Sequence, residues 1–367
     1  MKFTCSKEDI LYAVGKAEKA VSPKSTLAVM EGILVEARNN TVCLTGNDLE
    51  ISIEASFEAD VVRPGRIVLN SRTFGDIVRK CGGETVEFDV GDKYKTTIVS
   101  GNSVFEILGI NADEFPDNFE FDIDNSITIE AIDLKAMIRQ TIFATSKGEF
   151  RQILTGELFK VEGDYLKVVA LDGHRLAIRK EKLVKSAPLK DFIMPFKTLN
   201  ELLKIIGDDE TVEIFPSRKY IMLEFGGCRL YSRVIDGEFI NYEKIVNNEC
   251  PIKVRANAKK LKHSFERVSP IIYNETVKSP VKLNIVDNVM IIDCATLSGK
   301  IHDEAPIEKL YGNNLEIGFT NQYLLDAFGG CDEEVFLEFS TPLSPLVISP
   351  VEGDKFLYII LPVRLRK

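Results

Sequence analysis

The sequence predicts an α+β fold in which one unit of roughly 120 residues is repeated three times. Similar patterns of a short strand followed by a helix begin near Met1, Ile127 and Ile252, so the offset is about 125 residues each time. Each copy contains two runs with helical periodicity among many short runs that alternate as residues 86–90 do. Because the helical runs are well separated along the chain, the pattern favours α+β over a doubly wound sheet.

A second pattern also occurs three times, in the order strand, helix, acidic turn, strand. Its copies cover residues 64–88, 192–214 and 315–338. We expect helices over residues 6–21, 70–82, 132–147, 196–206, 256–268 and 320–330. The predicted N-caps are Ser6, Asp133, Asn257 and Thr198, the last with Glu201 as a capping box.

A polar turn forms the third repeated element. Residues 44–50 match residues 170–176, and residues 293–299 are a looser third copy. The predicted domains are therefore 1–120, 121–247 and 248–367, with linkers at 115–118 and 246–251.

Composition indicates an ordinary globular protein. The chain has 367 residues, which is too long for one typical core. Of these residues, 45% are hydrophobic and 28% are charged. Since no apolar run approaches the roughly 18 residues of a membrane span, and the N-terminus lacks a signal peptide, we expect a cytoplasmic protein with no membrane partner. The seven cysteines are odd in number and scattered, so we expect free thiols, no disulfide framework and no metal site.

The net charge of −10 argues at first against a nucleic-acid partner. The six predicted helices, however, sum to +7, so the remaining residues carry −17. Helices that face one common space would create a basic surface that attracts phosphates without reading bases. On the second helix the candidates for DNA contact are Arg72, Arg79 and Lys80. The alternative is that these cations simply lie on solvated helix faces.

The residues show no catalytic constellation. Of three histidines, only His174 lies in a stretch that suggests catalysis, Asp172-Gly173-His174-Arg175, and no nucleophile motif accompanies it. Phosphate-binding and dinucleotide-binding loops are also missing from the sequence. We therefore interpret residues 172–175 as a turn with local backbone capping, and we expect neither an enzyme nor a cofactor.

Three features together carry a family resemblance: the three repeats, the Ala-Leu-Asp-Gly-His-Arg-Leu stretch at 170–176 and the Leu-Pro-Val-Arg-Leu stretch at 361–365. Residues 21–34 also look like the family's first-repeat loop and strand. The whole chain thus resembles the bacterial DNA sliding clamp, the beta subunit of the replicative polymerase. The resemblance implies the DNA-clamp fold with antiparallel sheets, in a head-to-tail homodimer whose six domains form a ring around duplex DNA. It implies further partners, namely the polymerase, the clamp loader and other proteins that bind through a short linear peptide.

The resemblance also implies site residues. Further DNA contacts would be Lys24, Lys147, Arg151 and Lys197. The partner-peptide pocket would contain Leu154, Leu171, Gly173, His174, Arg175, Leu176, Ile240, Ile245, Tyr323, Leu343, Ile359, Ile360, Leu361, Pro362, Val363 and Arg364. At the dimer interface Phe105 and Ile107 would meet Ile271 and Ile272, although all four are also plausible core residues.

The sequence departs from the family pattern at three places. Ile240 stands where many relatives have proline, Arg366-Lys367 extends the usual end, and residues 273–278 align too poorly to supply a pocket residue. Two other functions compete with the clamp. A repeat-built scaffold for protein–protein interaction would never close into a ring, and a hydrolase would use His174.

Overall fold

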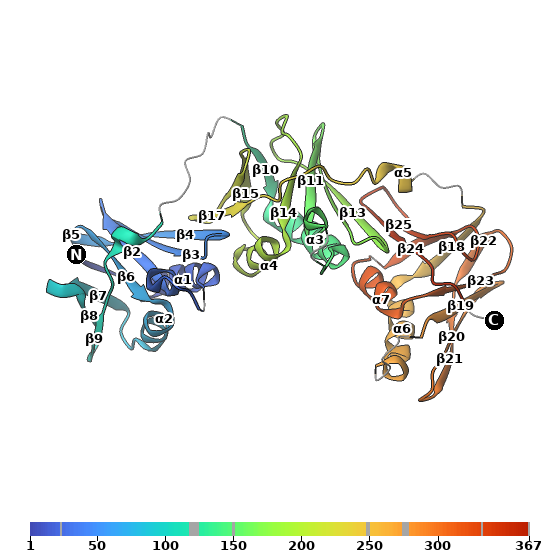
Figure 1. The fold of residues 1–367 in the computed structure, drawn as a ribbon, viewed down its shortest axis with the longest axis horizontal. Coiled ribbons are helices and arrows are strands. Elements are labelled where there is room, and N and C mark those ends of the chain that lie inside the picture. Colours follow the sequence, from blue (N-terminus) through green and yellow to red (C-terminus); the bar gives the residue numbers. More distant parts are fainter. Residues whose placement is uncertain are drawn as a thin grey trace. The chain divides into compact units, whose positions relative to one another are not determined.

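The computed structural model describes residues 1–22, 24–116, 125–148, 151–246, 250–273, 279–331 and 333–365. The predicted α+β class is confirmed, because helices lie against sheets whose strand pairs are all antiparallel in this part of the chain (Figure 1). Parts of both predicted linkers and the Arg366-Lys367 extension lie outside the described residues. No described helix is long and apolar enough to cross a membrane.

Contacts divide the chain into two compact units. Unit 1 comprises Met1–Ile132, Val184–Leu189 and Lys197–Val234, and unit 2 comprises Asp133–Leu183, Lys190–Phe196 and Ile235–Lys367. The second repeat is thus shared, since one of its sheets belongs to each unit. The three-domain division remains a prediction.

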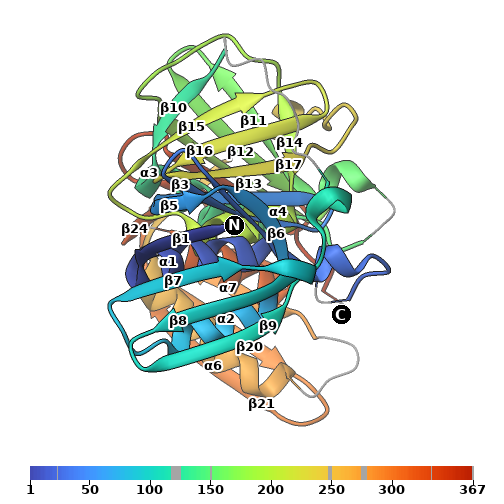
Figure 2. The same cartoon turned by 90° about the vertical axis from the view of Figure 1, so that its left-hand side faces the viewer.

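Unit 1 contains two sheets. The five-stranded sheet has the order β5 (Asp60–Arg63), β1 (Lys2–Ser6), β7 (Thr85–Val90), β8 (Lys95–Ser100) and β9 (Ser103–Leu108), and Figure 2 shows β7, β8 and β9 side by side. The eight-stranded sheet has the order β10 (Ile127–Glu130), β15 (Thr211–Pro216), β16 (Tyr220–Phe225), β17 (Cys228–Arg233), β4 (Ile51–Glu58), β3 (Thr41–Asn47), β2 (Gly32–Arg38) and β6 (Gly65–Asn70).

Unit 2 also contains two sheets. The nine-stranded sheet has the order β14 (Phe192–Pro195), β11 (Gly156–Glu162), β12 (Tyr165–Leu171), β13 (Arg175–Lys182), β26 (Phe356–Ile360), β25 (Leu346–Pro350), β24 (Glu334–Phe339), β18 (Ile252–Asn257) and β22 (Glu308–Tyr311). The four-stranded sheet has the order β21 (Lys300–Pro306), β20 (Val289–Ala295), β19 (Val281–Val286) and β23 (Leu315–Phe319).

The six predicted helices are all present, and the structure adds the short α5. The α-helices are α1 (Lys7–Ala17), α2 (Ser71–Lys80), α3 (Ala131–Thr141), α4 (Phe196–Ile205), α5 (Glu243–Val246), α6 (Ala258–Ile272) and α7 (Asn321–Gly329). Short 3₁₀ turns are η1 (Glu18–Ala20), η2 (Ala28–Glu31), η3 (Asp92–Tyr94), η4 (Ala112–Glu114), η5 (Ile142–Ala144) and η6 (Gln152–Leu154).

Two of the four predicted helix caps are correct. The side chains of Ser6 and Asn257 accept hydrogen bonds from the amides of Glu8 and Lys260. The predicted caps Asp133 and Thr198 are wrong, because α3 and α4 begin two residues earlier and both side chains lie inside the helices. Thr198 is buried, and its hydroxyl lies 2.6 Å from Oγ of Ser232. Strand-end geometry, rather than the nearest polar residue, therefore sets these two starts.

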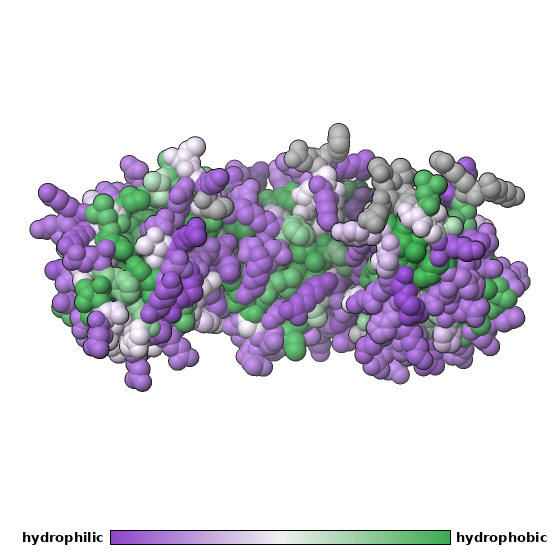
Figure 3. All heavy atoms as spheres, turned by 90° about the horizontal axis from the view of Figure 1, so that it is seen from below, coloured by the Kyte–Doolittle hydropathy of each residue, from purple (hydrophilic) through white to green (hydrophobic). Residues whose placement is uncertain are grey.

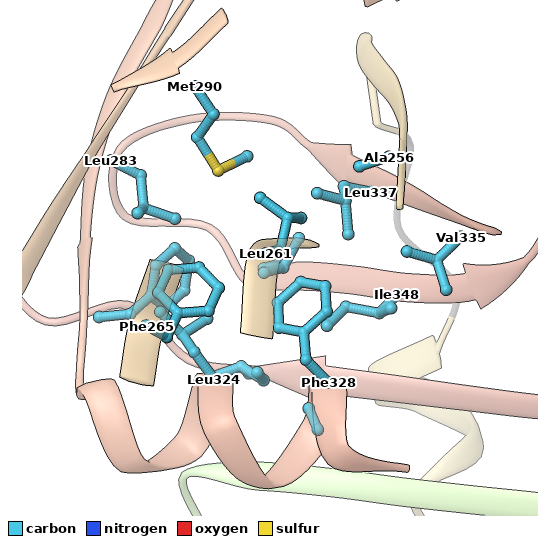
Figure 4. Packing of buried hydrophobic residues seen from close by; sticks show 14 of the residues in the cluster. Ala256, Leu261, Phe265, Leu283, Met290, Leu324, Phe328, Val335, Leu337 and Ile348 are labelled. Atoms are coloured by element: carbon cyan, nitrogen blue, oxygen red, sulfur yellow. The ribbon is translucent and has the colours of Figure 1, made fainter. Parts of the chain in front are cut away.

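Apolar helix faces pack on the sheets in both units. In unit 1, Phe3 stacks on Phe88 with ring centroids 4.9 Å apart, and Phe74 of α2 meets the same ring edge-on. In unit 2, Leu261 and Phe265 of α6 and Leu324 and Phe328 of α7 converge on the strands (Figure 4). Burial of such side chains stabilises each unit by about 2 kcal/mol per residue before entropy is counted.

Candidate functional site

The turn between β12 and β13 carries the most specific sequence motif. Oδ1 of Asp172 accepts hydrogen bonds from the backbone amides of His174 (2.9 Å) and Arg175 (3.1 Å). Gly173 has φ +91°, a left-handed conformation that glycine adopts without a steric penalty. The turn thus fixes the directions of His174 and Arg175, and the Asp172 carboxylate acts on backbone rather than on the imidazole.

Arg175 is held on several sides. Its Nε lies 2.9 Å from Oδ2 of Asp172, and its Nη1 pairs with Asp326 of α7. Nη2 donates to the carbonyl of Phe143, and the guanidinium lies 4.5 Å from the ring of Tyr323. The side chain is only 9% exposed. Arg175 therefore connects the second and third repeats within unit 2, and each of its three nitrogens donates a hydrogen bond inside the chain.

His174 lies at the surface beside that connection. Its ring stacks on Tyr323 with centroids 6.0 Å apart and planes inclined by 22°. Its carbonyl accepts a hydrogen bond from the amide of Leu361 at 2.8 Å. The structure thus brings Gly173, His174, Arg175, Tyr323 and Leu361 together, as the prediction for the peptide pocket requires.

An apolar cluster lies on the opposite face of the same strands. Predicted pocket residues that belong to it are Leu154, Leu171, Leu176 and Ile359, all buried, with Ile240 and Ile245 packed against them. Among the further residues of this cluster that sequence reasoning missed are Phe239, Tyr242 and Val347. Burial raises the pKa of Tyr242 to about 12, so its phenol stays protonated. A polar tip in an apolar cluster is typical of sites that orient a ligand.

Other predicted pocket residues lie apart from that cluster. Ile360 points to the other face of β26 and belongs to the core of the third repeat. Leu343 is exposed between β24 and β25, and no described contact joins it to the cluster. Leu361, Val363 and Arg364 are exposed and Pro362 is half-buried; the amide of Val363 donates to the carbonyl of Gly318 (2.8 Å).

The basic residues fall into two groups. Arg79 pairs with Glu18 at 2.9 Å and Asp76 at 3.1 Å, and these carboxylates raise its pKa. Lys197 pairs with Asp48 at 2.7 Å and Glu50 at 2.6 Å. Acids of the same chain thus compensate both charges.

The other five cations are exposed and form no ion pair within the described part of the chain. They are Lys24, Arg72, Lys80, Lys147 and Arg151. Hydrophilic side chains cover most of the face that Figure 3 shows, in keeping with a charged content of 28%.

The predicted interface residues differ in exposure. Phe105 and Ile107 are half-buried on β9, and Ile271 is half-buried near the end of α6. Ile272 is 5% exposed and belongs to the core of the third repeat, so it offers no free surface as the chain stands. Sequence reasoning did not single out three large exposed apolar side chains, Val104 and Leu108 on β9 and Leu297 in the β20–β21 turn.

Comparisons with known proteins agree along the whole chain. Profiles of the DNA polymerase III beta subunit match as the N-terminal domain over residues 1–120, the central domain over 128–241 and the C-terminal domain over 244–364. A beta sliding clamp from Staphylococcus epidermidis is 31% identical over 375 residues and covers 99% of both chains.

Solved structures give the same result. The DNA polymerase sliding clamp from Bacillus subtilis superimposes with a TM-score of 0.96 at 32% identity, and a putative DNA polymerase III beta subunit from Eubacterium rectale with 0.95 at 34%. Each comparison covers 100% of both chains. Sequence and structure therefore agree that the chain belongs to the DNA polymerase III beta subunit family, the beta sliding clamps.

Proposed function

We propose that two copies of this chain close head to tail into a ring that encircles duplex DNA and keeps a polymerase on it. One observation carries this proposal: consecutive repeats are joined by strand pairing. β4 of the first repeat pairs with β17 of the second, and β13 of the second pairs with β26 of the third. In a chain built this way, the first and the last repeat each keep one strand for a further pairing of this kind. A second copy supplies the partner strand for both.

The proposal includes the predicted domain limits of 1–120, 121–247 and 248–367, which the three matched profile ranges support. It also includes a cytoplasmic location, where duplex DNA and the polymerase are found. A ring retains DNA by topology, so it does not need strong affinity. Lys24, Arg72, Lys80, Lys147 and Arg151 would supply a weak, sequence-independent attraction to phosphates.

Retention on DNA of two topologies tests the ring. We expect the protein, once loaded by its clamp loader, to remain on nicked circular duplex through gel filtration and to leave when one cut linearises that duplex. Equal loss from both would contradict encirclement. A chain that stays monomeric by light scattering and is never retained would favour the interaction scaffold.

We propose that partner peptides bind unit 2 over the apolar cluster, between the turn at residues 172–175 and the segment that follows β26. The exposed side chains of Leu361 and Val363 present an apolar surface just after β26, whose Ile359 packs with the buried Leu171 and Leu176. Such a surface with a few polar groups suits an extended peptide. Replication proteins that carry a short linear motif would share it.

Peptide affinity tests this surface. We expect Val363→Asp and Leu361→Asp each to weaken binding of a labelled peptide from the replicative polymerase by about tenfold or more, because a carboxylate would replace apolar contact. Val184→Asp is the matched control, since Val184 is also exposed but belongs to unit 1. Equal effects of all three variants would contradict the assignment.

We propose no catalytic activity for the chain itself. The His174 ring stacks on Tyr323, and Asp172 bonds to backbone amides and to Arg175, so the pair that suggested a hydrolase serves the turn. A turnover that His174→Ala abolishes while peptide binding persists would overturn this.

A further inference from the structure

A hollow of about 520 Å³ lies in unit 1, where the ends of its two sheets meet. The β2–β3 hairpin and the beginning of β6, both from the eight-stranded sheet, form one side of it. The other side is β5, an end strand of the five-stranded sheet. Sites for small organic ligands commonly have volumes of about 300 to 1,000 Å³, so the hollow is large enough for one.

The hairpin turn at its rim is fixed by backbone. Asn39 and Asn40 form a two-residue turn between the paired Arg38 and Thr41, with φ of 51° and 59°. Two consecutive positive φ values are typical of the tightest hairpin turns, and asparagine tolerates them. The carbonyl of Asn40 accepts a hydrogen bond from the amide of Ala59 at 3.0 Å. Both asparagine side chains are exposed and form no hydrogen bond among the described residues, so their amides remain available to a ligand.

Two arginines line the hollow, one of them held in place. Nη2 of Arg66 donates to the carbonyl of Ala112 at 3.3 Å, and its Nε lies 4.0 Å from Oε1 of Glu36 on the opposite strand. Arg38 is exposed and has neither an ion pair nor a hydrogen bond in the described part of the chain. A guanidinium matches the oxygens of a phosphate with two parallel hydrogen bonds. The hollow therefore presents one fixed and one adjustable anion-binding group.

The rest of the lining is mixed. The carboxylate of Glu36 is 47% exposed and can accept a hydrogen bond from a donor on a ligand. Ala37, Val61 and Pro64 form an apolar wall. A ligand that uses all of these groups has an anionic end, an apolar body and an edge with hydrogen-bond donors and acceptors.

The same hairpin turn recurs in the other repeats, between β11 and β12 and between β19 and β20. In the second repeat, the carbonyl of Asp164 accepts from the amide of Leu183 at 2.9 Å. In the third repeat, the carbonyl of Asn288 accepts from the amide of Ile307 at 3.0 Å. Each acceptor is the second turn residue, as Asn40 is, so the three turns are equivalent positions of the repeat.

The side chains at these equivalent positions differ in charge. Arg38 corresponds to Glu162 and to Val286, since each residue directly precedes its turn. By the same cross-strand register, Arg66 of β6 corresponds to Glu316 of β23. Acids and a valine serve the fold equally well at these places. The two cations are therefore a property of the first repeat and not a requirement of the repeated structure.

The other repeats also use their equivalent polar groups internally. In the second repeat, Lys160 pairs with Glu162 at 2.9 Å and with Glu243 of α5 at 3.1 Å. In the third repeat, Oδ1 of Asn288 accepts from the amide of Lys309 at 3.0 Å. In the first repeat, by contrast, the turn side chains and the arginine before them form no such bonds among the described residues.

We propose that this hollow binds a nucleotide, with its phosphate between Arg38 and Arg66. The base would lie against Val61 and Pro64, with an exocyclic amino group that donates to Glu36. Asparagine amides pair with the edge of adenine through two hydrogen bonds, a role that fits the turn. Inorganic phosphate would leave the amides and the apolar wall unused, whereas an apolar ligand would leave two guanidiniums unpaired. A free nucleotide and a nucleotide unit of a single strand share this chemistry.

Equilibrium dialysis of the full chain against radiolabelled adenosine monophosphate tests the site. We expect one saturable site per chain with a Kd between about 10 μM and 1 mM. Arg38→Gln and Arg66→Gln should each weaken binding by about tenfold, because each removes a charge-assisted pair with the phosphate. Asn40→Gly should weaken it by about threefold while the turn persists, because glycine adopts a positive φ without penalty.

Arg229→Gln is the matched control. Arg229 is an exposed arginine of unit 1 that pairs with Glu224 at 3.0 Å and lies outside the hollow. Its loss changes the net charge by the same amount and should leave the Kd for the nucleotide unchanged. The three altered positions in the hollow are exposed, so thermal unfolding should show that those variants remain folded.

Competitors identify the source of the nucleotide. If a single-stranded oligoadenylate displaces the label, and Arg38→Gln weakens its own binding, the hollow takes a unit of a strand. If free nucleotides alone displace the label, it takes the free ligand.

Three results would overturn the proposal. One is the lack of saturable binding up to about 10 mM nucleotide. Another is displacement of the label by inorganic phosphate as effectively as by adenosine monophosphate. The third is an equal effect of Arg38→Gln and Arg229→Gln. These measurements do not depend on whether the chain closes into a ring.

Discussion

We infer that Arg175 supports the proposed peptide-binding surface without touching the peptide itself. Its guanidinium bonds to Asp172, Asp326 and the Phe143 carbonyl. These groups come from the β12–β13 turn, α7 and η5. Because each nitrogen of the guanidinium already donates to an acceptor of the chain, we interpret Arg175 as a positioning residue that holds the turn and Tyr323 in place, whereas the family resemblance implied a direct peptide contact.

Removal of this guanidinium should destabilise unit 2. We expect Arg175→Ala to lower the free energy of unfolding by about 3 kcal/mol, because two mostly buried carboxylates lose their partner. Arg229→Ala is the control: its pair with Glu224 is about half exposed, so we expect a loss below about 1 kcal/mol. Chemical unfolding curves measure both, and equal losses would contradict the positioning role.

Glu157 is a fully buried acid on β11. Its Oε1 lies 2.8 Å from Oγ1 of Thr141, which also lies 2.8 Å from the carbonyl of Met137. Desolvation raises the pKa of Glu157 well above its usual value, and the Thr141 hydroxyl only partly opposes this. Since one hydroxyl hydrogen cannot serve both neighbours, a protonated Glu157 can donate to Thr141 while Thr141 donates to Met137.

This acid should make stability depend on pH. The pKa is higher in the folded than in the unfolded state, so the folded state binds the proton more strongly and stability falls as pH rises above about 4.5 until the folded pKa is reached. We expect Glu157→Gln to flatten this slope between about pH 5 and 8, measured by urea unfolding. Glu58→Gln, at an exposed position on β4, should leave the slope unchanged.

At the scale of elements, a buried lysine of α1 forms a hydrogen bond to the end of α4. Nζ of Lys16 donates to the carbonyl of Ile205, the last residue of α4, at 2.6 Å. Its ammonium also lies 4.2 Å from the centroid of the Tyr12 ring. A cation at a helix C-terminus interacts favourably with the helix dipole. This contact joins the first and second repeats within unit 1.

Loss of that cation should loosen the connection. We expect Lys16→Met to lower the unfolding free energy of the chain by about 1 to 2 kcal/mol, because the apolar stem remains while a buried carbonyl loses its donor. Lys19→Met, in the exposed part of η1, should change it by less than about 0.5 kcal/mol. A Lys16→Met variant with an unchanged free energy of unfolding would show that water replaces the ammonium.

For the whole molecule, charge compensation distinguishes among the cations that we propose to contact DNA. Within the described residues, Arg79 and Lys197 pair with acids of the same chain, whereas Arg72 and Lys80 form no ion pair. Residue type and helix position are the same in both groups. The neighbouring acids distinguish them: Asp76 of the same helix and Glu18 for Arg79, and Asp48 and Glu50 for Lys197.

This difference should appear in the salt dependence of DNA binding. We expect Arg72→Ala and Lys80→Ala each to reduce the slope of log affinity against log salt by about 0.9, since each phosphate contact releases counterions. Arg79→Ala should reduce it by clearly less, because Glu18 and Asp76 already offset that charge. Anisotropy with a short duplex at several salt concentrations measures the slopes, and three equal slopes would contradict the distinction.

The sequence by itself determined the α+β class, the three repeats, all six long helices and the family. Periodicity and repetition are local properties, so they can be read without knowing which segments meet. It misplaced the caps of α3 and α4 at Asp133 and Thr198, because both helices begin directly after a strand ends. The sequence match of 44–50 with 170–176 is also shifted by two residues. In the hairpins, Asp48 and Asp172 are the equivalent turn residues, because each accepts a hydrogen bond from the amide three residues later.

The tertiary structure decided which side chains share a site. Arg175 meets Asp326 across 151 positions of sequence, and Lys197 meets Glu50 across 147. Such pairs depend on strand pairing between repeats, which brings a turn of one repeat to the second helix of the next. No local pattern encodes that distance. For the same reason the sequence leaves Ile272 open between an interface and a core position, whereas in the structure it packs in a core and Val104 is exposed on an edge strand.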